Sequence, residues 1–220
     1  IFLFSFPTSS NAAPADYKIE INKRTNYLYL YKNGKVAKTY RVATGKTSKL
    51  TPTGTFVIGV KIVKPGWKNI PGGHPKNPLG PRWIGLVVNN DRARTYGIHG
   101  TNDPNSIGKH ASNGCIRMRN NDVIELYKTI YEGTPVWIHT GTSNKKWRGN
   151  ANVGLKRFSG KAQVTASQLY VRSGPTTGAF VIGKTKKGTI LTITGGTSNW
   201  YQIRYNGKTG FVYKPYTKRK

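Results

Sequence analysis

Apolar and polar side chains alternate with a period of two near the start of the chain. In residues 27–31, three tyrosines interleave with two leucines, the pattern of a half-buried β-strand. Asn33 and Gly34 follow this run and precede another at 35–45, and both residue types tolerate positive φ, so the two runs predict a hairpin. Similar short runs, rich in β-branched and aromatic residues, occur at 51–63, 82–88 and 134–140.

A helical spacing is clearest between residues 120 and 133. The residues expected to share its apolar face are Val123, Ile124, Tyr127 and Ile130. Asn120, Asn121 or Asp122 is expected to cap its start, and Gly133 is expected to end it. The segment 65–81, rich in Pro and Gly, predicts instead a long loop that lines or covers a functional site.

The pattern divides the chain into two folded parts. Residues 141–160 are polar, basic and aperiodic, which predicts a linker. Residues 161–216 return to short strands, with a second hairpin signal at Asn206–Gly207, and a small β-barrel would protect the edges of their sheet. The fold class expected is therefore mainly β: a sheet-rich domain with one main helix at 16–140, and a small barrel at 161–216.

The first fifteen residues read as the remnant of a secretory signal peptide. An apolar start is followed by polar and small residues, and Ala13-Pro14-Ala15 fits the small-x-small pattern that precedes cleavage. An ordinary first strand is the alternative, but Pro7 and Pro14 argue against it. No later segment is long and apolar enough for a transmembrane span. We therefore expect a secreted protein.

The charge narrows the choice of partners. The chain has 36 Lys and Arg against 7 Asp and Glu, a formal net charge of +29, which favours polyanions. Nucleic acid, anionic lipid and the anionic cell wall of a Gram-positive bacterium all qualify. Because the basic residues are spread along the whole length and no element is suited to a nucleic-acid groove, we expect no nucleic-acid partner.

The chain contains one cysteine, Cys115, so no disulfide can form within it. An inert buried thiol is the simplest alternative, but His99 lies sixteen residues upstream in a His-Gly pair, where an imidazole could take the thiol proton. His110 is a rival base, although its flanking residues suggest an exposed position. The other two histidines, His74 and His139, show no ligand spacing, and with few carboxylates we expect no metal site and no cofactor.

The residues around the thiol suggest acyl chemistry. In Ser112-Asn113-Gly114-Cys115, a glycine before the nucleophile permits a tight turn and would leave backbone N–H groups open toward a substrate carbonyl. Arg117 would share the face of the thiol if the segment is extended, and a guanidinium there could hold a substrate carboxylate. In a chain this basic, Arg117 could equally be a solvated charge.

The pairing of "HG" with "SNGCIRM" sixteen residues later resembles the signature of L,D-transpeptidase (YkuD-type) catalytic domains. The stretches "TPTGTF", "NPLGPRWIGL" and "DVIELY" are also similar to that family, over roughly 16–140. The resemblance implies a β-sandwich fold with the thiol at the end of a cleft. It implies Cys115 as nucleophile, His99 as base and the Gly100 carbonyl as its orienting group, with Ser112, Gly114 and Arg117 lining the donor pocket. One departure is Asn113, where many members have histidine.

The implied reaction acts on peptidoglycan stem peptides. Cys115 would attack at the third residue of a stem tetrapeptide, release D-Ala, and pass the acyl group to an amine of another stem as a 3→3 cross-link. Carbapenems would then be covalent inhibitors. Two alternatives remain: an L,D-carboxypeptidase that uses water as acceptor, and a catalytically inactive wall-binding protein. Residues 161–216 resemble a bacterial SH3 domain, which implies binding to the cell-wall polymer. We expect the protein to be a monomer.

Overall fold

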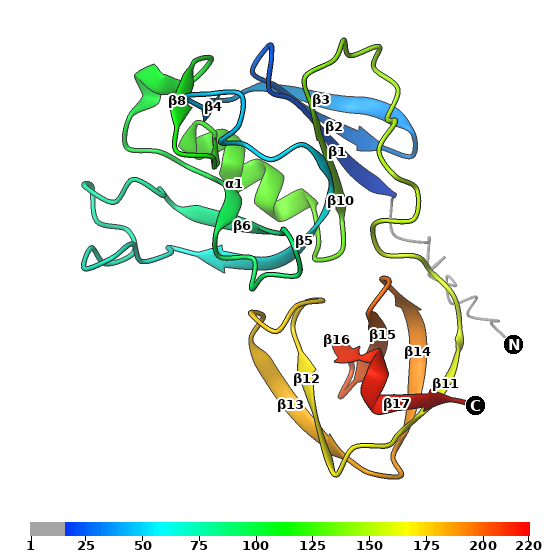
Figure 1. Ribbon diagram of the computed structural model, residues 1–220. Coiled ribbons are helices and arrows are strands. Elements are labelled where there is room, and N and C mark those ends of the chain that lie inside the picture. The colour runs from blue at the N-terminus through cyan, green and yellow to red at the C-terminus, as the bar shows by residue number, and fades with distance from the viewer. Residues whose placement is uncertain (1–15) are drawn as a thin grey trace, which may run out of the picture.

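The computed structural model describes residues 16–220, so the expected signal-peptide remnant at 1–15 lies outside the described residues. Two β-rich parts follow one another along the chain and lie end to end (Figure 1). Among the described residues, the longest α-helix and the candidate catalytic residues belong to the first part.

The first domain is built on one eight-stranded sheet. Its strands, in the order in which they lie side by side, are β3 (Lys35–Arg41), β2 (Tyr27–Lys32), β1 (Tyr17–Asn22), β10 (Pro135–His139), β5 (Gly54–Val63), β6 (Arg82–Val87), β7 (Tyr96–His99) and β9 (Ile116–Arg117). Neighbouring strands are antiparallel except for the pairs β1–β10 and β7–β9. Two short strands, β4 (Thr44–Gly45) and β8 (His110–Ser112), form a separate parallel pair. The hairpin predicted at Asn33–Gly34 is confirmed, with φ of 51° and 80°.

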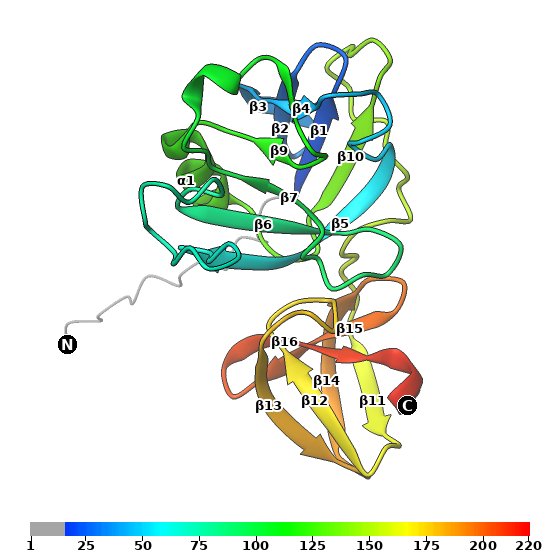
Figure 2. The ribbon, with the colours of Figure 1, turned by 60° about the vertical axis from the view of Figure 1, so that its left-hand side comes forward.

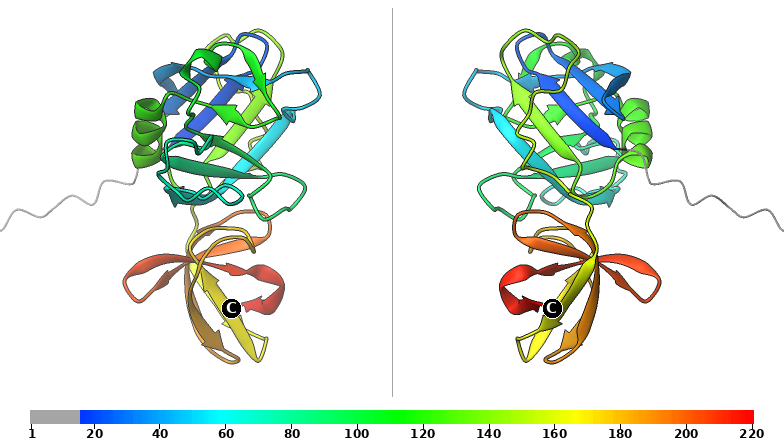
Figure 3. Two further views of the ribbon diagram at one scale, coloured as in Figure 1. Left: turned by 90° about the vertical axis from the view of Figure 1, so that its left-hand side faces the viewer. Right: turned by 90° about the vertical axis from the view of Figure 1, so that its right-hand side faces the viewer.

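The sheet curls so that its two halves enclose a common core, and α1 (Asn120–Thr129) covers one side of the curl (Figure 3). Buried residues of β1, β2, β5, β6, β7, β9 and β10 pack with those of the helix in a single cluster. Burial of this apolar surface is the main source of stability for such a domain. The expected mainly β, sandwich-like fold with one main helix is confirmed.

The helix differs from its prediction at both ends and on its buried face. Arg119 occupies the N-cap position without a side-chain hydrogen bond, and the helix ends at Thr129 because Ile130 is already extended, before Gly133 is reached. Val123 and Leu126 are fully buried and Ile130 is nearly so, whereas the predicted Ile124 is only half-buried. Packing against the curled sheet therefore rotates the helix relative to the predicted face.

The second domain is a seven-stranded, strongly curved sheet of the SH3 type (Figure 2). Its strands lie in the order β13 (Val181–Lys186), β12 (Gln168–Arg172), β16 (Lys208–Tyr213), β15 (Trp200–Tyr205), β14 (Ile190–Gly196), β11 (Gly160–Val164) and β17 (Thr217–Arg219). Two 3-10 turns complete the described elements: η1 (Pro104–Ser106) in the first domain and η2 (Lys214–Tyr216) in the second. The hairpin predicted at Asn206–Gly207 joins β15 to β16.

Residues 141–159, between the two domains, contain neither helix nor strand, but they pack against both. The indole N–H of Trp147 donates to the Ile19 carbonyl at 3.2 Å. Lys156 and Gly196 exchange two backbone hydrogen bonds of 2.9 Å, one in each direction. These contacts thus join the segment to both domains. The linker boundaries expected from the sequence, 141 and 160, stay predictions.

Replacing Leu126 by Ala tests the observed orientation of the helix. Because Leu126 is completely buried in the core, we expect Leu126→Ala to lower the free energy of unfolding by about 2–5 kcal/mol, measured by urea denaturation. Ile124→Ala is the matched control, and its half-buried side chain should cost clearly less. Equal losses would contradict the orientation described here.

Candidate active site

The pairing of β7 with β9 brings the two halves of the sequence motif together. These strands are parallel, with Ile98 opposite Ile116 and His99 opposite Arg117. Because side chains alternate along a strand, His99 and Arg117 project from the same face of the sheet, and Cys115 lies in the bend that directly precedes β9. The histidine of the motif and the bend that carries its cysteine are thereby brought to one edge of the sheet.

The turn that carries Cys115 is held by its own backbone and by Ser112. Gly114 has φ of 127°, and a Cβ there would lie 2.6 Å from the Leu50 carbonyl oxygen, so only glycine fits. The buried Ser112 hydroxyl donates to the Cys115 carbonyl at 2.6 Å and accepts from the Gly114 N–H at 3.0 Å. The Gly114 N–H is therefore already bound by Ser112, and the expectation of backbone N–H groups open toward a substrate at this turn stays a prediction.

Two residues that the sequence analysis did not single out support the same turn. The Thr51 hydroxyl donates to the Gly114 carbonyl at 3.0 Å and accepts from the Gly45 N–H at 2.8 Å. The Lys23 ammonium donates to the carbonyls of Ser48 and Thr51, and burial lowers the pKa of Lys23. A buried cation thus holds the 48–51 loop, and this loop in turn holds the turn that carries Cys115.

His99 is buried and held in one orientation. Its Nδ1 lies 2.6 Å from the Gly100 carbonyl oxygen, and because a carbonyl only accepts, Nδ1 carries the proton and Nε2 is left to accept one. The Trp83 indole stacks on the ring, with centroids 5.6 Å apart. A Cβ on Gly97 would lie 2.7 Å from this indole, so the glycine makes room for it beside Cys115, which packs in the same apolar cluster as Trp83.

The end of the 65–81 loop packs directly against the His99–Gly100 segment. A Cβ on Gly80 would come within 2.8 Å of the Gly100 Cα. The Asn120 side chain, at the start of α1, accepts the Thr101 N–H at 2.9 Å. This loop and the helix therefore position the carbonyl that orients the imidazole, in agreement with the expected role of the loop.

Burial determines the protonation of both groups. It lowers the pKa of His99 to about 4, an effect increased by Arg117 and opposed by hydrogen bonds to the backbone of Gly100 and Leu79. It also raises the pKa of the Cys115 thiol, although the Gly97 backbone and Arg117 act in the opposite direction. Near neutral pH the resting site therefore holds a neutral thiol and a neutral imidazole, not an ion pair.

Arg117 lies beside the motif and is partly exposed. Its nearest carboxylate is Asp103, with Nη1 and Oδ2 3.8 Å apart. The chain after Asp103 forms the 3-10 turn η1, and the Asp103 side chain makes no cap hydrogen bond to it. The guanidinium is thus loosely paired and remains available to an anionic ligand.

The rival base, His110, is exposed, and its Nδ1 lies 3.1 Å from the Thr44 hydroxyl. His74 is also exposed and accepts the Lys76 N–H through Nδ1 at 3.2 Å. Within residues 16–220, no three His, Cys, Asp or Glu side chains gather as a group that could hold a metal ion.

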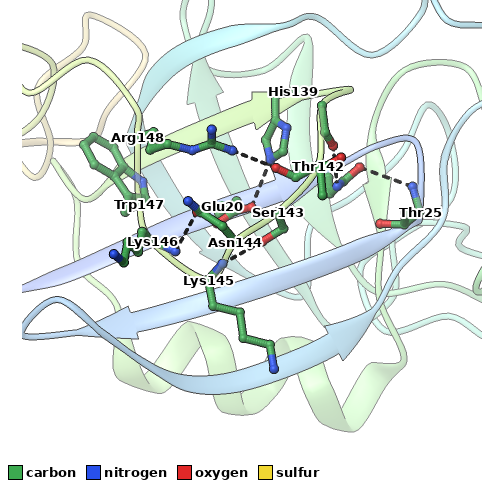
Figure 4. A network of polar contacts seen from close by, with 12 residues as sticks. Glu20, Thr25, His139, Thr142, Ser143, Asn144, Lys145, Lys146, Trp147 and Arg148 are labelled. Atoms are coloured by element: carbon green, nitrogen blue, oxygen red, sulfur yellow. Dashed lines mark hydrogen bonds and ion pairs between the residues drawn. The ribbon is translucent and has the colours of Figure 1, made fainter.

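His139 belongs to a buried polar network with Glu20 (Figure 4). The Glu20 carboxylate, fully buried, accepts from Tyr31 at 2.5 Å and lies 3.0 Å from His139 Nε2. Trp137 stacks on His139 with centroids 4.0 Å apart, and the Arg148 guanidinium lies 5.3 Å from the centroid of Trp137. These contacts satisfy a buried carboxylate and help to fasten the 141–148 segment.

Comparisons with known proteins agree with the resemblance. Residues 16–138 match the model of the L,D-transpeptidase catalytic domain (YkuD), and residues 167–218 match that of a bacterial SH3 domain. YqjB of Bacillus subtilis, named as an L,D-transpeptidase, is 50% identical over 135 residues, covering 60% of this chain and 77% of YqjB. YkuD of Bacillus licheniformis, named likewise, is 39% identical over 132 residues, covering 60% of this chain and 71% of YkuD.

Among solved structures, the catalytic domain of the E. faecium L,D-transpeptidase is 27% identical, with a TM-score of 0.46. The match covers 56% of this chain and 97% of that one. Within the described residues, no helix combines the length and apolar character needed to cross a membrane.

The pKa of His99 predicts how stability depends on pH. The unfolded chain takes up this proton near pH 6.5 and the folded chain near pH 4, so stability falls as pH falls through this window. The depression of about 2.5 units corresponds to about 3 kcal/mol. We expect His99→Gln to remove that part of the loss between pH 7 and 4, measured by urea denaturation. The exposed His110→Gln should leave the slope unchanged, and an unchanged slope in His99→Gln would refute the assignment.

Thr51→Val tests the support of the nucleophile's turn. It keeps the shape of the side chain but leaves a buried carbonyl and a buried N–H without their partner, so we expect a loss of about 1–3 kcal/mol in the free energy of unfolding. Thr53→Val, at an exposed position, is the matched control. If both variants unfold at the same urea concentration, the Thr51 hydroxyl does not stabilise this turn.

Proposed function

The chain belongs to the L,D-transpeptidase (YkuD) catalytic-domain family, and we propose that it forms 3→3 cross-links between peptidoglycan stem peptides through an acyl-enzyme on Cys115. The observation that carries the proposal is the parallel pairing of β7 and β9, which brings His99 beside Arg117 and beside the bend that carries Cys115. Trp83 links the two groups, because it packs with Cys115 and stacks on His99. Membership in this family assigns the enzyme class, and the geometry supports the residue roles.

In the first half-reaction, Cys115 Sγ attacks the carbonyl carbon of the third stem residue while its proton passes to His99 Nε2. The tetrahedral intermediate then collapses, the C–N bond to the terminal D-Ala breaks, and His99 returns the proton to the leaving amine. A thioester remains on Cys115. Because both groups start neutral, proton transfer accompanies the attack, and the imidazole acts as a general base rather than as the partner of a preformed thiolate.

In the second half-reaction, the side-chain amine of another stem attacks the thioester carbonyl. The new amide bond forms, the C–S bond breaks, and His99 moves the proton of the amine to the departing sulfur. Gly100 keeps Nε2 directed to this task through its contact with Nδ1. The roles of Arg117 in binding a stem carboxylate and of Ser112 and Gly114 in the donor pocket stay predictions; the contacts of Ser112 and Gly114 suit shaping the turn.

We further propose that the protein works outside the cell, on the wall of a Gram-positive bacterium. The net charge of +29 suits an anionic wall, and the SH3 domain would hold the enzyme on the polymer and raise the local concentration of stems. The same acyl chemistry would make Cys115 a target of carbapenems.

The direct test incubates the full chain with disaccharide-tetrapeptide and analyses the products by mass spectrometry. We expect free D-Ala and a dimer whose mass is that of two monomers less one D-Ala. Neither product should form with Cys115→Ala. His99→Gln should reduce the rate by about 10²-fold or more, whereas His110→Gln should leave it unchanged. Intact-mass measurement after carbapenem exposure should show a covalent adduct on the wild type and none on Cys115→Ala.

Each alternative has its own result in this experiment. Tripeptide with D-Ala but no dimer would identify an L,D-carboxypeptidase. No product and no carbapenem adduct on the folded wild type would indicate a catalytically inactive wall-binding protein and would overturn the proposal.

A further inference from the structure

A groove of about 620 Å³ lies between the two domains. One wall comes from the start of β5, the end of β6 and the loop 88–95 between β6 and β7. The other comes from the second domain, at Thr176, Ser198, Asn199, Trp200 and Tyr213. Figure 2 shows the β6–β7 loop at the edge of the first domain that faces the second. Ligand sites commonly form at such domain junctions.

The groove carries little charge for a chain of this composition. Lys and Arg make up 36 of 220 residues, yet none lines the groove, and Asp91 is the one charged residue among the described residues that do. A second hollow between the domains, of about 520 Å³, does contain Arg157 and Lys208. The first groove offers a polyanion no cationic side chain to pair with, so we expect the groove to bind a neutral molecule.

The lining has the groups that bind sugars. Amides come from Asn89, Asn90, Asn152 and Asn199, and hydroxyls from threonine and serine side chains; both kinds of group donate and accept. The rings of Trp200 and Tyr213, with centroids 5.1 Å apart, offer apolar surface at one end. We propose that this groove binds an uncharged segment of the glycan strand whose stem peptide is processed at Cys115.

Direct contacts between the domains hold the groove open in one shape. The Thr176 hydroxyl donates to the Asp91 carbonyl at 3.0 Å, and Arg94 donates to the Gly178 carbonyl at 3.3 Å. Gly174 packs so closely on the first domain that a Cβ there would lie 2.2 Å from the Gly59 carbonyl oxygen. A ligand therefore meets a preformed site, with little ordering cost.

The same loop connects the groove to the thiol. Asp91 lines the groove, and four residues later the Thr95 carbonyl lies 3.7 Å from Cys115 Sγ. Four residues of extended chain span at most about 14 Å, and the three stem residues before the attacked carbonyl span about 10 Å. The two lengths are of the same order, which is consistent with a glycan in the groove presenting its own stem to Cys115. The delivery of the stem to Cys115 rests on the proposed function, whereas the binding of sugar in the groove does not.

The test measures binding of the N-acetylglucosamine hexamer, a neutral probe, to the full chain by calorimetry. The variant Asn90→Gly/Asn199→Ala removes two amides without strain, since Asn90 has φ of 59° and glycine accepts that conformation. We expect the dissociation constant to rise about tenfold or more. Asn206→Gly, an exposed asparagine of positive φ in the β15–β16 hairpin, is the matched control and should bind like the wild type.

Salt and acylation separate this proposal from the others. The dissociation constant of the hexamer should stay the same between about 50 and 500 mM salt. Ionic binding to a polyanion weakens steeply over a range of this order. No binding, binding lost with salt, or equal binding by the groove variant would overturn the proposal. Carbapenem acylation of Cys115 should be normal in the groove variant; failed acylation in the wild type would count against the proposed function and leave the hexamer result standing.

Discussion

The parallel pairing of β7 and β9 is the constraint on which the site depends. Both strands are short, and β9 has only two residues, so their own hydrogen bonds contribute little stability. The register is instead maintained by what surrounds them: Ile98 and Ile116 are completely buried in the core, and the Arg117 N–H and carbonyl bond to Ala43 on the other side. A slip of one residue would send His99 and Arg117 to opposite faces and would shift the bend that carries Cys115.

The sequence was most informative where local chemistry decides the structure. The two Asn-Gly hairpins, the alternating strands and the His-Gly and Gly-Cys pairs could all be found because their conformations follow from neighbouring residues. Thr51 and Lys23 could not, since their partners lie far away along the chain and depend on how the 48–51 loop returns to Gly114. The buried face of α1 was missed for a similar reason: Leu126 and Ile124 look equivalent until the sheet that covers them is known.

The charge shows how composition and local structure can point in different directions. Summed over the chain, the excess of cations argues for an anionic partner. The contacts that join the domains use few of them, however, and the groove so formed is lined by amides, hydroxyls and aromatic rings. In the proposed function, the cationic surface of the chain would then attract the protein to the wall, and the groove would bind one neutral component of that wall.

The protonated state of the resting thiol also bears on how easily the single cysteine is oxidised. Peroxides and disulfides react with thiolates, and the rate of sulfenic acid formation follows the fraction ionised. Burial keeps that fraction small at Cys115, and no second thiol exists in the chain to capture an oxidised sulfur as a disulfide. Desolvation therefore protects the Cys115 thiol from oxidation, and in the proposed mechanism the same desolvation keeps the thiol protonated until a substrate is bound and the neutral imidazole takes the proton.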